Sequence, residues 1–172
     1  KEDLSSSILI SIRPLIEKDP NYSYVVARLL LNNLYEEALS FLNFDENTPT
    51  FKDMSKSYPA YFKSYLGRAV ELELVDKELL TYDIDYIAKH INPAKDLAFT
   101  YLGLQTLYDR YFIHHREQRF ELPQAFFMRV AMGLAINEKK REERTVEFYN
   151  LISSFDFMCS TPTLFNSGTL RP

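Results

Sequence analysis

The chain has 172 residues, of which 46% are hydrophobic and 15% aromatic, and its net charge is −4. A domain of this length buries enough surface to fold without disulfides or a metal, and no apolar run approaches the roughly 20 residues that cross a bilayer. The acidic balance argues against a nucleic-acid partner, because such partners require a basic surface. The single cysteine, Cys159, excludes an internal disulfide and a cysteine-rich zinc site, and it favours a cytoplasmic location.

Hydrophobic periodicity predicts a mainly α protein, a bundle of about seven helices. In chain order we expect them over residues 3–18, 21–42, 58–75, 83–90, 93–108, 123–134 and 141–154. Residues 43–57 are polar and predict a loop with at most one short helical turn.

Prolines and capping residues place several helix ends. Pro14 lies inside the first helix and should kink or divide it, whereas Pro59 suits the first turn of the third. Asp83 is a candidate cap for the fourth helix. Asn92 followed by Pro93 is a start signal for the fifth, because it joins a capping residue to a proline at the first helical position.

Apolar spacing also predicts which side chains are buried in the last three helices. These residues are Leu97, Tyr101, Leu104 and Leu107 or Tyr108 in the fifth helix, Phe126, Phe127, Val130, Ala131 and Leu134 in the sixth, and Val146, Phe148, Tyr149 and Ile152 in the seventh.

Two segments depart from the helical pattern. Residues 111–122 place short apolar runs on both sides of a polar stretch, which predicts one small β-hairpin. Residues 156–172 contain Pro162 and Gly168 and show no helical period, so we expect an extended C-terminal tail.

Catalytic and metal sites are not predicted from the residue pattern. His114 and His115 are neighbours, and adjacent strand residues point to opposite faces, so a surface position is expected for both. His90 suits a helix C-terminus, where a cation meets the negative end of the dipole. A free cysteine such as Cys159 is usually a small buried hydrophobe, and we assign it no catalytic role.

The tail is the one segment suited to bind an anion. Pro162 should restrict Thr161 to an extended backbone, and Ser160, Thr161 and Thr163 offer three hydroxyl groups within four residues. Free backbone N–H groups follow, and such donors recur at phosphate sites. An ordinary capped turn is an alternative that these residues leave open.

The tail sequence STPTLFNSGTLRP, residues 160–172, resembles the start of the catalytic region of ribonucleotide reductase large subunits. Further blocks in the same order resemble the helical N-terminal region of that family. They are DPNYSYVVARLLLNNLYEEAL (19–39), YLGLQTLYDRYFI (101–113), PQAFFMRVAMGLA (123–135) and FYNLISSFDF (148–157). The blocks look closer to the class I enzymes than to the adenosylcobalamin class.

This resemblance implies a function and a division of the chain. The family reduces ribonucleotides to deoxyribonucleotides by thiyl-radical chemistry, with cysteines expected downstream of Pro172. Residues 1–156 would form the all-α N-terminal domain, and 157–172 would begin the catalytic barrel region. Thr161 matches the first threonine of the family's T-P-T run and would help bind the substrate's phosphates, so it is the one site residue carried over.

The resemblance also implies partners. The parent enzyme would form a homodimer, use a radical from a metal-containing small subunit and respond to ATP and dNTP effectors. This piece would hold no cofactor, would be inactive alone and would bind ribonucleoside diphosphates weakly or not at all, with no nucleic acid or membrane as partner. The alternative is a free-standing helical protein-interaction module.

Overall fold

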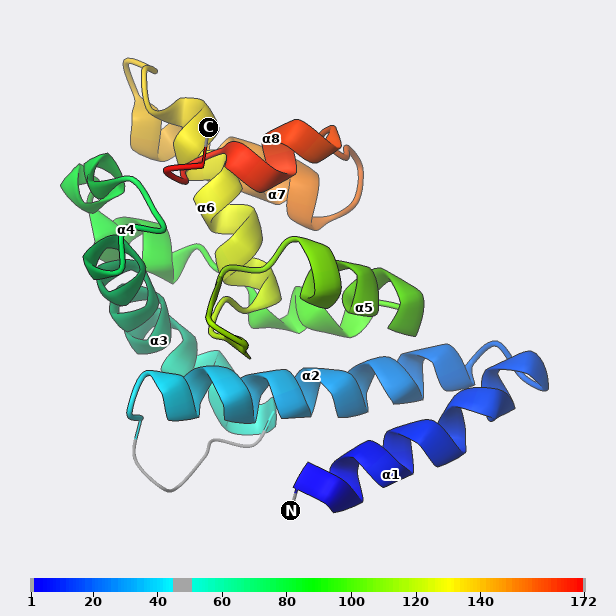
Figure 1. Ribbon diagram of the computed structural model, residues 1–172. Helices are drawn as coiled ribbons and strands as arrows, with labels where there is room; N and C mark the ends of the chain where they lie inside the picture. Colours follow the sequence, from blue (N-terminus) through cyan, green and yellow to red (C-terminus); the bar gives the residue numbers. More distant parts are fainter. Residues whose placement is uncertain (1, 45–50, 172) are drawn as a thin grey trace.

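The computed structural model describes residues 2–44 and 51–171. Within these residues the chain is mainly α with one small antiparallel sheet, which confirms the predicted fold class (Figure 1). The α-helices are α1 (Glu2–Ile12), α2 (Tyr22–Phe41), α3 (Phe51–Glu71), α4 (Ile84–Lys89), α5 (Tyr101–Arg110), α6 (Pro123–Ala135), α7 (Arg141–Ser153) and α8 (Thr161–Asn166). Short 3-10 helices η1 (Arg13–Glu17), η2 (Lys77–Thr81) and η3 (Pro93–Ala98) lie between some of them.

Helices α1 and α2 pack side by side along one edge of the molecule (Figure 1). Pro14 lies in η1, so α1 gives way to a tighter helix at the proline, which confirms the predicted division. The next helix follows a turn in which Asp19 Oδ1 accepts a hydrogen bond from the Asn21 N–H at 2.9 Å.

Helix α3 begins earlier than the sequence predicts. It starts at Phe51, so Pro59 lies inside the helix and not in its first turn. The buried stripe explains the difference: Met54 is fully buried, one turn before Tyr58 and on the same face, so core packing extends the helix through the proline. The rest of the predicted loop at 43–57 falls partly outside the described residues.

The predicted helix over residues 93–108 is interrupted. Asn92 does cap η3, accepting from the Ala94 N–H at 3.1 Å, but the chain extends at Phe99 and a new helix, α5, begins after Thr100. Phe99 is buried against the rings of Phe127 and Phe155. The burial of the Phe99 ring favours an extended backbone at this residue, which separates η3 from α5. Helical periodicity alone could not indicate this interruption.

The predicted hairpin is present, with its strands in the polar stretch itself. Strands β1 (His114–His115) and β2 (Gln118–Arg119) pair antiparallel. Arg116, at the turn, has φ of 56°, so a non-glycine residue takes the left-handed conformation here.

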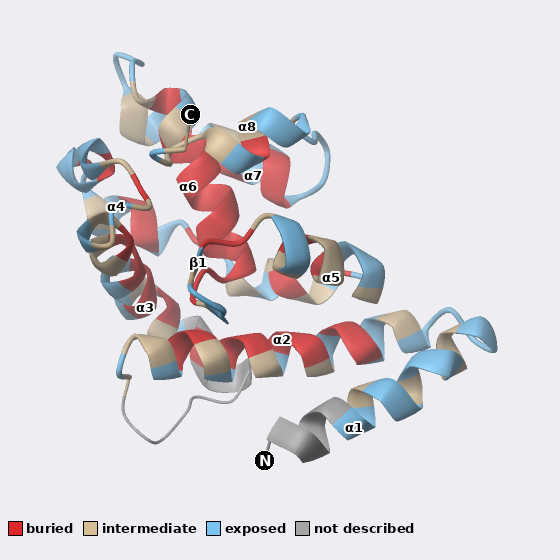
Figure 2. Ribbon diagram, in the orientation of Figure 1, coloured by how far each residue is buried: buried red, intermediate tan, exposed pale blue. Residues whose placement is uncertain are grey.

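Helix α6 lies at the centre of the core (Figure 2). Every residue from 121 to 132 is buried, so all of this helix except its last turn is enclosed on all sides. Leu134 is 43% exposed, which corrects the prediction that it is buried, whereas Met132 and Ala135 in the same turn are fully buried. Of the residues predicted to be buried in the fifth and seventh helices, some are buried as predicted: Leu104, Leu107, Tyr149 and Ile152. Others are only half-buried: Leu97, Tyr101, Val146 and Phe148.

The predicted extended tail, residues 156–172, is wrong over residues 161–166. Residues 161–166 form the short helix α8, in which Pro162 lies in the first turn and Thr161 begins the helix. Outside α8 the tail is not helical: Ser160, before the helix, has an extended backbone, and Thr169, after it, forms an isolated antiparallel bridge with Val75. A proline favours a first helical turn because its fixed φ is helical and its missing N–H is not needed there.

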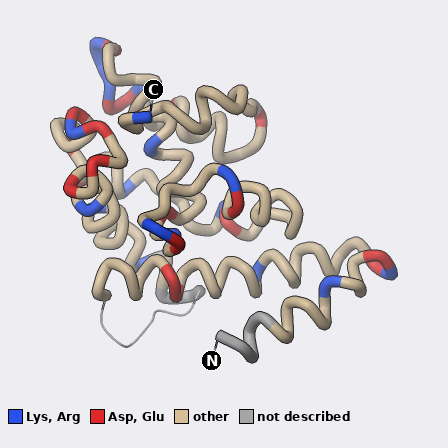
Figure 3. Tube along the Cα trace, viewed as in Figure 1, with Lys and Arg blue, Asp and Glu red and all other residues tan. Residues whose placement is uncertain are grey.

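Charged residues of both signs are scattered along the described part of the chain (Figure 3). No helix among the described residues is both long enough and apolar enough to cross a membrane.

Candidate functional site

A buried ion pair lies beneath the C-terminal segment, residues 160–171. Glu121 precedes α6 and Arg129 lies within it, and both side chains are 0% exposed. Arg129 Nε donates to Glu121 Oε1 at 2.7 Å and Nη2 donates to Oε2 at 3.2 Å. This two-point geometry fits the planar guanidinium to the carboxylate.

Other groups complete the pair. Tyr65 of α3 donates its hydroxyl to Glu121 Oε1, and the Ile113 N–H donates to Oε2 at 2.8 Å. Burial alone would lower the pKa of Arg129, but the adjacent Glu121 carboxylate raises it. The guanidinium and the carboxylate therefore compensate each other inside the core, where an unpaired charge would be costly.

Arg129 also holds the C-terminal segment. Its Nη1 donates to the Ser167 carbonyl at 2.6 Å, and Ser167 Oγ donates to the Val130 carbonyl at 2.8 Å. The chain after α8 is thus attached to α6 by a charged donor and by a hydroxyl.

The fit between this segment and α6 depends on glycine. A Cβ at Gly133 would lie 2.2 Å from the Gly168 nitrogen and 2.4 Å from Ser167 Oγ. Gly168 itself has φ of +73°, a conformation that favours glycine. Its carbonyl accepts from the Asp76 N–H at 3.1 Å, so the segment is bound on two sides.

Thr161, the predicted site residue, is exposed at the start of α8. Its Oγ1 lies 3.0 Å from the hydroxyl of Tyr111, the residue that follows α5. Ser160 Oγ and Thr163 Oγ1 lie 3.3 Å from each other. The three hydroxyls do not converge on one point: two pair with each other and the third pairs with a tyrosine.

A second buried polar cluster lies between α2, η3, α6 and α7. Asp96 is 2% exposed and accepts from the Tyr35 hydroxyl and from Gln124 Nε2, both at 2.7 Å. Tyr149 donates to Gln124 Oε1 at 2.8 Å and accepts from the Asn92 N–H at 2.9 Å. Burial raises the pKa of Asp96 to about 7, although its two hydrogen bonds act in the opposite direction.

The histidines take structural positions. His90 follows α4 as its C-terminal cap, with Nδ1 2.8 Å from the Tyr86 carbonyl oxygen. In the hairpin His114 is exposed, as predicted, whereas His115 is half-buried. Cys159 is half-buried, and burial raises the pKa of its thiol. Among the residues that the structure describes, no group of histidine, cysteine and carboxylate side chains could hold a metal ion.

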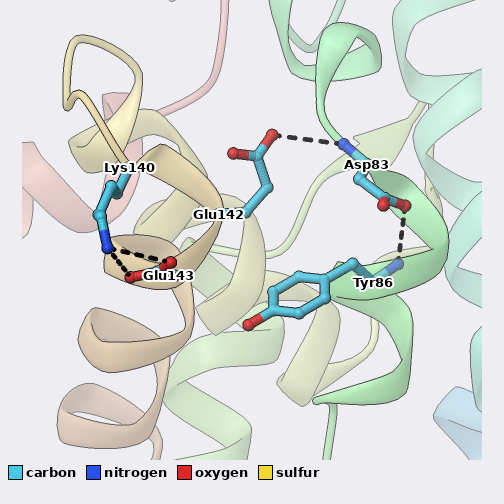
Figure 4. A pocket seen from close by; sticks show the side chains of 5 residues that line it. All are labelled: Asp83, Tyr86, Lys140, Glu142 and Glu143. Carbon is cyan, nitrogen blue, oxygen red and sulfur yellow. Dashed lines mark hydrogen bonds and ion pairs between the residues drawn. The ribbon is translucent and has the colours of Figure 1, made fainter.

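A shallow pocket lies between the starts of α4 and α7 (Figure 4). It is lined by Asp83, Tyr86, Lys140, Glu142 and Glu143. Asp83 caps α4 through the Tyr86 N–H at 3.0 Å, and Lys140 pairs with Glu143 at 3.1 Å. Asp83 is thus a helix cap and Lys140 is neutralised by Glu143, and the pocket shares no residue with the surroundings of Thr161.

Sequence reasoning did not identify Glu121, Arg129 or Tyr111 as parts of this site. One signal was available: Arg129 is the single charged residue in the apolar run PQAFFMRVAMGLA. A charge inside a buried helix requires a partner, and Glu121 is the nearest carboxylate along the chain. Nothing in the sequence indicated that Tyr111 meets Thr161, 50 residues away.

Comparison with known proteins identifies relatives. The family described as "Ribonucleotide reductase, all-alpha domain" matches residues 97–172. The chain is 42% identical over 160 residues to the ribonucleoside-diphosphate reductase subunit alpha of Chlamydia trachomatis, covering 93% of this chain and 15% of that protein. It is 33% identical over 173 residues to the subunit alpha of Helicobacter pylori, covering 99% of this chain and 20% of the relative.

A eukaryotic relative gives a similar alignment. The ribonucleoside-diphosphate reductase large subunit of Plasmodium falciparum is 32% identical over 155 residues, which cover 89% of this chain and 18% of that protein. The chain thus spans a fifth or less of these relatives. Because the likeness extends over nearly all of its residues, the chain belongs to the ribonucleotide reductase large-subunit family, and its residues 97–172 match the all-α domain of that family.

Proposed function

We propose that the protein containing this chain reduces ribonucleoside diphosphates to deoxyribonucleotides, and that this chain supplies a helical scaffold with one substrate contact. The observation that carries the proposal is the alignment of 93% of the chain with a protein named as the alpha subunit of such a reductase. The full reaction needs several cysteine thiols, and this chain has only Cys159. The isolated chain is therefore proposed to be inactive. In the complete enzyme, we propose, a metal-containing small subunit supplies the radical, and ATP and dNTPs act as effectors.

Thr161 is the proposed substrate contact. Its hydroxyl is exposed, and it stands on a segment that the buried ion pair and the Gly133 contact hold against α6. A hydroxyl on a rigid support can bind a phosphate oxygen with little loss of conformational entropy on binding. Its role would be to position the nucleotide, not to take part in bond breaking.

Thr161→Val in the complete large subunit tests this role. Loss of a hydrogen bond to a charged group costs about 1.5–3 kcal/mol, so the KM for CDP should rise by roughly tenfold or more. The valine keeps the shape of an exposed side chain and removes one surface hydrogen bond, so the free energy of unfolding should change by no more than about 0.5 kcal/mol.

Thr163→Val is the matched control, because its hydroxyl is directed to Ser160 and not to the proposed ligand. We expect its KM to stay within about twofold of the parent value. Normal kinetics for Thr161→Val, or an equal rise in KM for both variants, would exclude a specific contact at Thr161.

A further inference from the structure

Tyr111 connects the core to Thr161. It follows α5, where its N–H donates to the Leu107 carbonyl at 2.9 Å. Its ring packs against Phe126 in a T-shaped arrangement at 6.3 Å, and the Arg129 guanidinium lies over the same Phe126 ring at 5.2 Å. The phenol is thus held by the helix whose arginine also holds the C-terminal segment.

In the hydrogen bond between Tyr111 and Thr161, either hydroxyl could be the donor. Each hydroxyl has one proton to donate and two lone pairs, and the 3.0 Å separation of the two oxygens suits either donor. A phenol is the stronger hydrogen-bond donor of the two, because it is far more acidic than an aliphatic alcohol. The favoured arrangement has Tyr111 donating and Thr161 accepting, and this leaves the threonine proton unused.

We infer that Tyr111 is a positioning residue that directs the Thr161 proton toward a phosphate oxygen of a ribonucleoside diphosphate. This inference rests on the proposed function, because it supposes that Thr161 contacts the substrate. A hydroxyl that accepts one hydrogen bond becomes a better donor in a second, so the tyrosine strengthens the threonine–phosphate bond as well as orienting it. Tyr111 itself need not touch the nucleotide.

Removal of the phenolic oxygen alone tests the inference. Tyr111→Phe in the complete large subunit should raise the KM for CDP about three- to tenfold, with kcat within twofold. In the Thr161→Val background the same change should have almost no further effect on KM, because the threonine hydroxyl that Tyr111 orients is absent there. In the Thr161→Ser background, which keeps the hydroxyl, the effect should return.

Tyr108→Phe is the matched control. Tyr108 lies on α5, and its hydroxyl donates to Glu37 Oε2 at 3.0 Å, away from Thr161. Its removal should leave the KM for CDP within twofold, which separates a specific effect from the general loss of a tyrosine hydroxyl.

The outcomes separate the two claims. If Thr161→Val raises KM but Tyr111→Phe does not, the substrate contact stands and the role of Tyr111 is rejected. An undiminished effect of Tyr111→Phe in the Thr161→Val background also rejects it, since the tyrosine would then act independently of the threonine. If Thr161→Val leaves KM unchanged, the proposed substrate contact fails and the inference fails with it.

Discussion

Helix α6 contributes to two buried polar clusters, and the buried carboxylate in each is compensated in a different way. Near its start, Gln124 binds the carboxylate of Asp96, which receives only neutral donors. One turn past Gln124, Arg129 meets Glu121 and cancels its charge. A neutral donor compensates a buried carboxylate only in part, whereas a cation with two-point geometry lets both groups remain charged.

As a result, the Asp96 cluster responds to pH, whereas the Glu121–Arg129 pair holds distant segments of the chain together. The pKa of Asp96 is raised to about 7, so its protonation changes near neutrality. The Glu121–Arg129 pair holds three parts of the chain together through Tyr65, the Ile113 N–H and the Ser167 carbonyl. The segment that carries Thr161 is held by the Glu121–Arg129 pair, through Arg129 and the Ser167 carbonyl.

The largest effect is expected from Arg129→Met. This change leaves Glu121 charged and buried without its cation, so the free energy of unfolding should fall by about 3–5 kcal/mol. Urea denaturation of the 172-residue chain, followed by circular dichroism, measures the loss. The Glu121→Gln, Arg129→Met double variant should lose less than the sum of the two single variants. Additive losses would mean that the two groups are not coupled, and the contrast between the clusters would disappear.

Asp96 should give the chain a pH dependence of opposite sign to most carboxylates. Its pKa rises from 3.8 to about 7 on folding, so between these values the folded state keeps a proton that the unfolded chain has lost. Stability therefore falls as pH rises through this window, by roughly 2–3 kcal/mol between pH 5 and pH 8. The comparison is made by urea denaturation at both pH values for the parent and for Asp96→Asn. If Asp96→Asn keeps the full dependence, other groups cause it.

The smallest effect is expected from Gly133→Ala, which disturbs the contact with the C-terminal segment while leaving both clusters in place. The new Cβ would meet Gly168 and Ser167, so we expect a loss of about 1–3 kcal/mol and faster amide exchange in residues 161–170. Gly67→Ala is the control, because nothing lies within 4 Å of its Cβ position. That helical change should stabilise the chain by about 0.5–1 kcal/mol. Unchanged exchange in Gly133→Ala would show that the segment adjusts freely.

Local signals were reliable where one residue type decides a conformation. Asp83 and Asn92 cap their helices as predicted, and Pro14 divides the first helix, because capping and proline geometry depend on immediate neighbours. Pro162 shows the limit of such signals. It restricts the preceding residue in one context and starts a helix in another, and packing of residues 161–168 on α6 selected the helix.

The sequence by itself determined the mainly α class, most helix positions, the hairpin and the family resemblance, because periodicity, caps and motifs are properties of neighbouring residues. The tertiary structure alone decided that α3 continues through Pro59, that Phe99 interrupts the predicted fifth helix and that Tyr111 reaches Thr161. It also decided that Arg129 pairs with Glu121 and holds Ser167. Each of these depends on contacts between distant segments, and the free energy of burying a ring or pairing a charge then exceeds the local preference of the backbone.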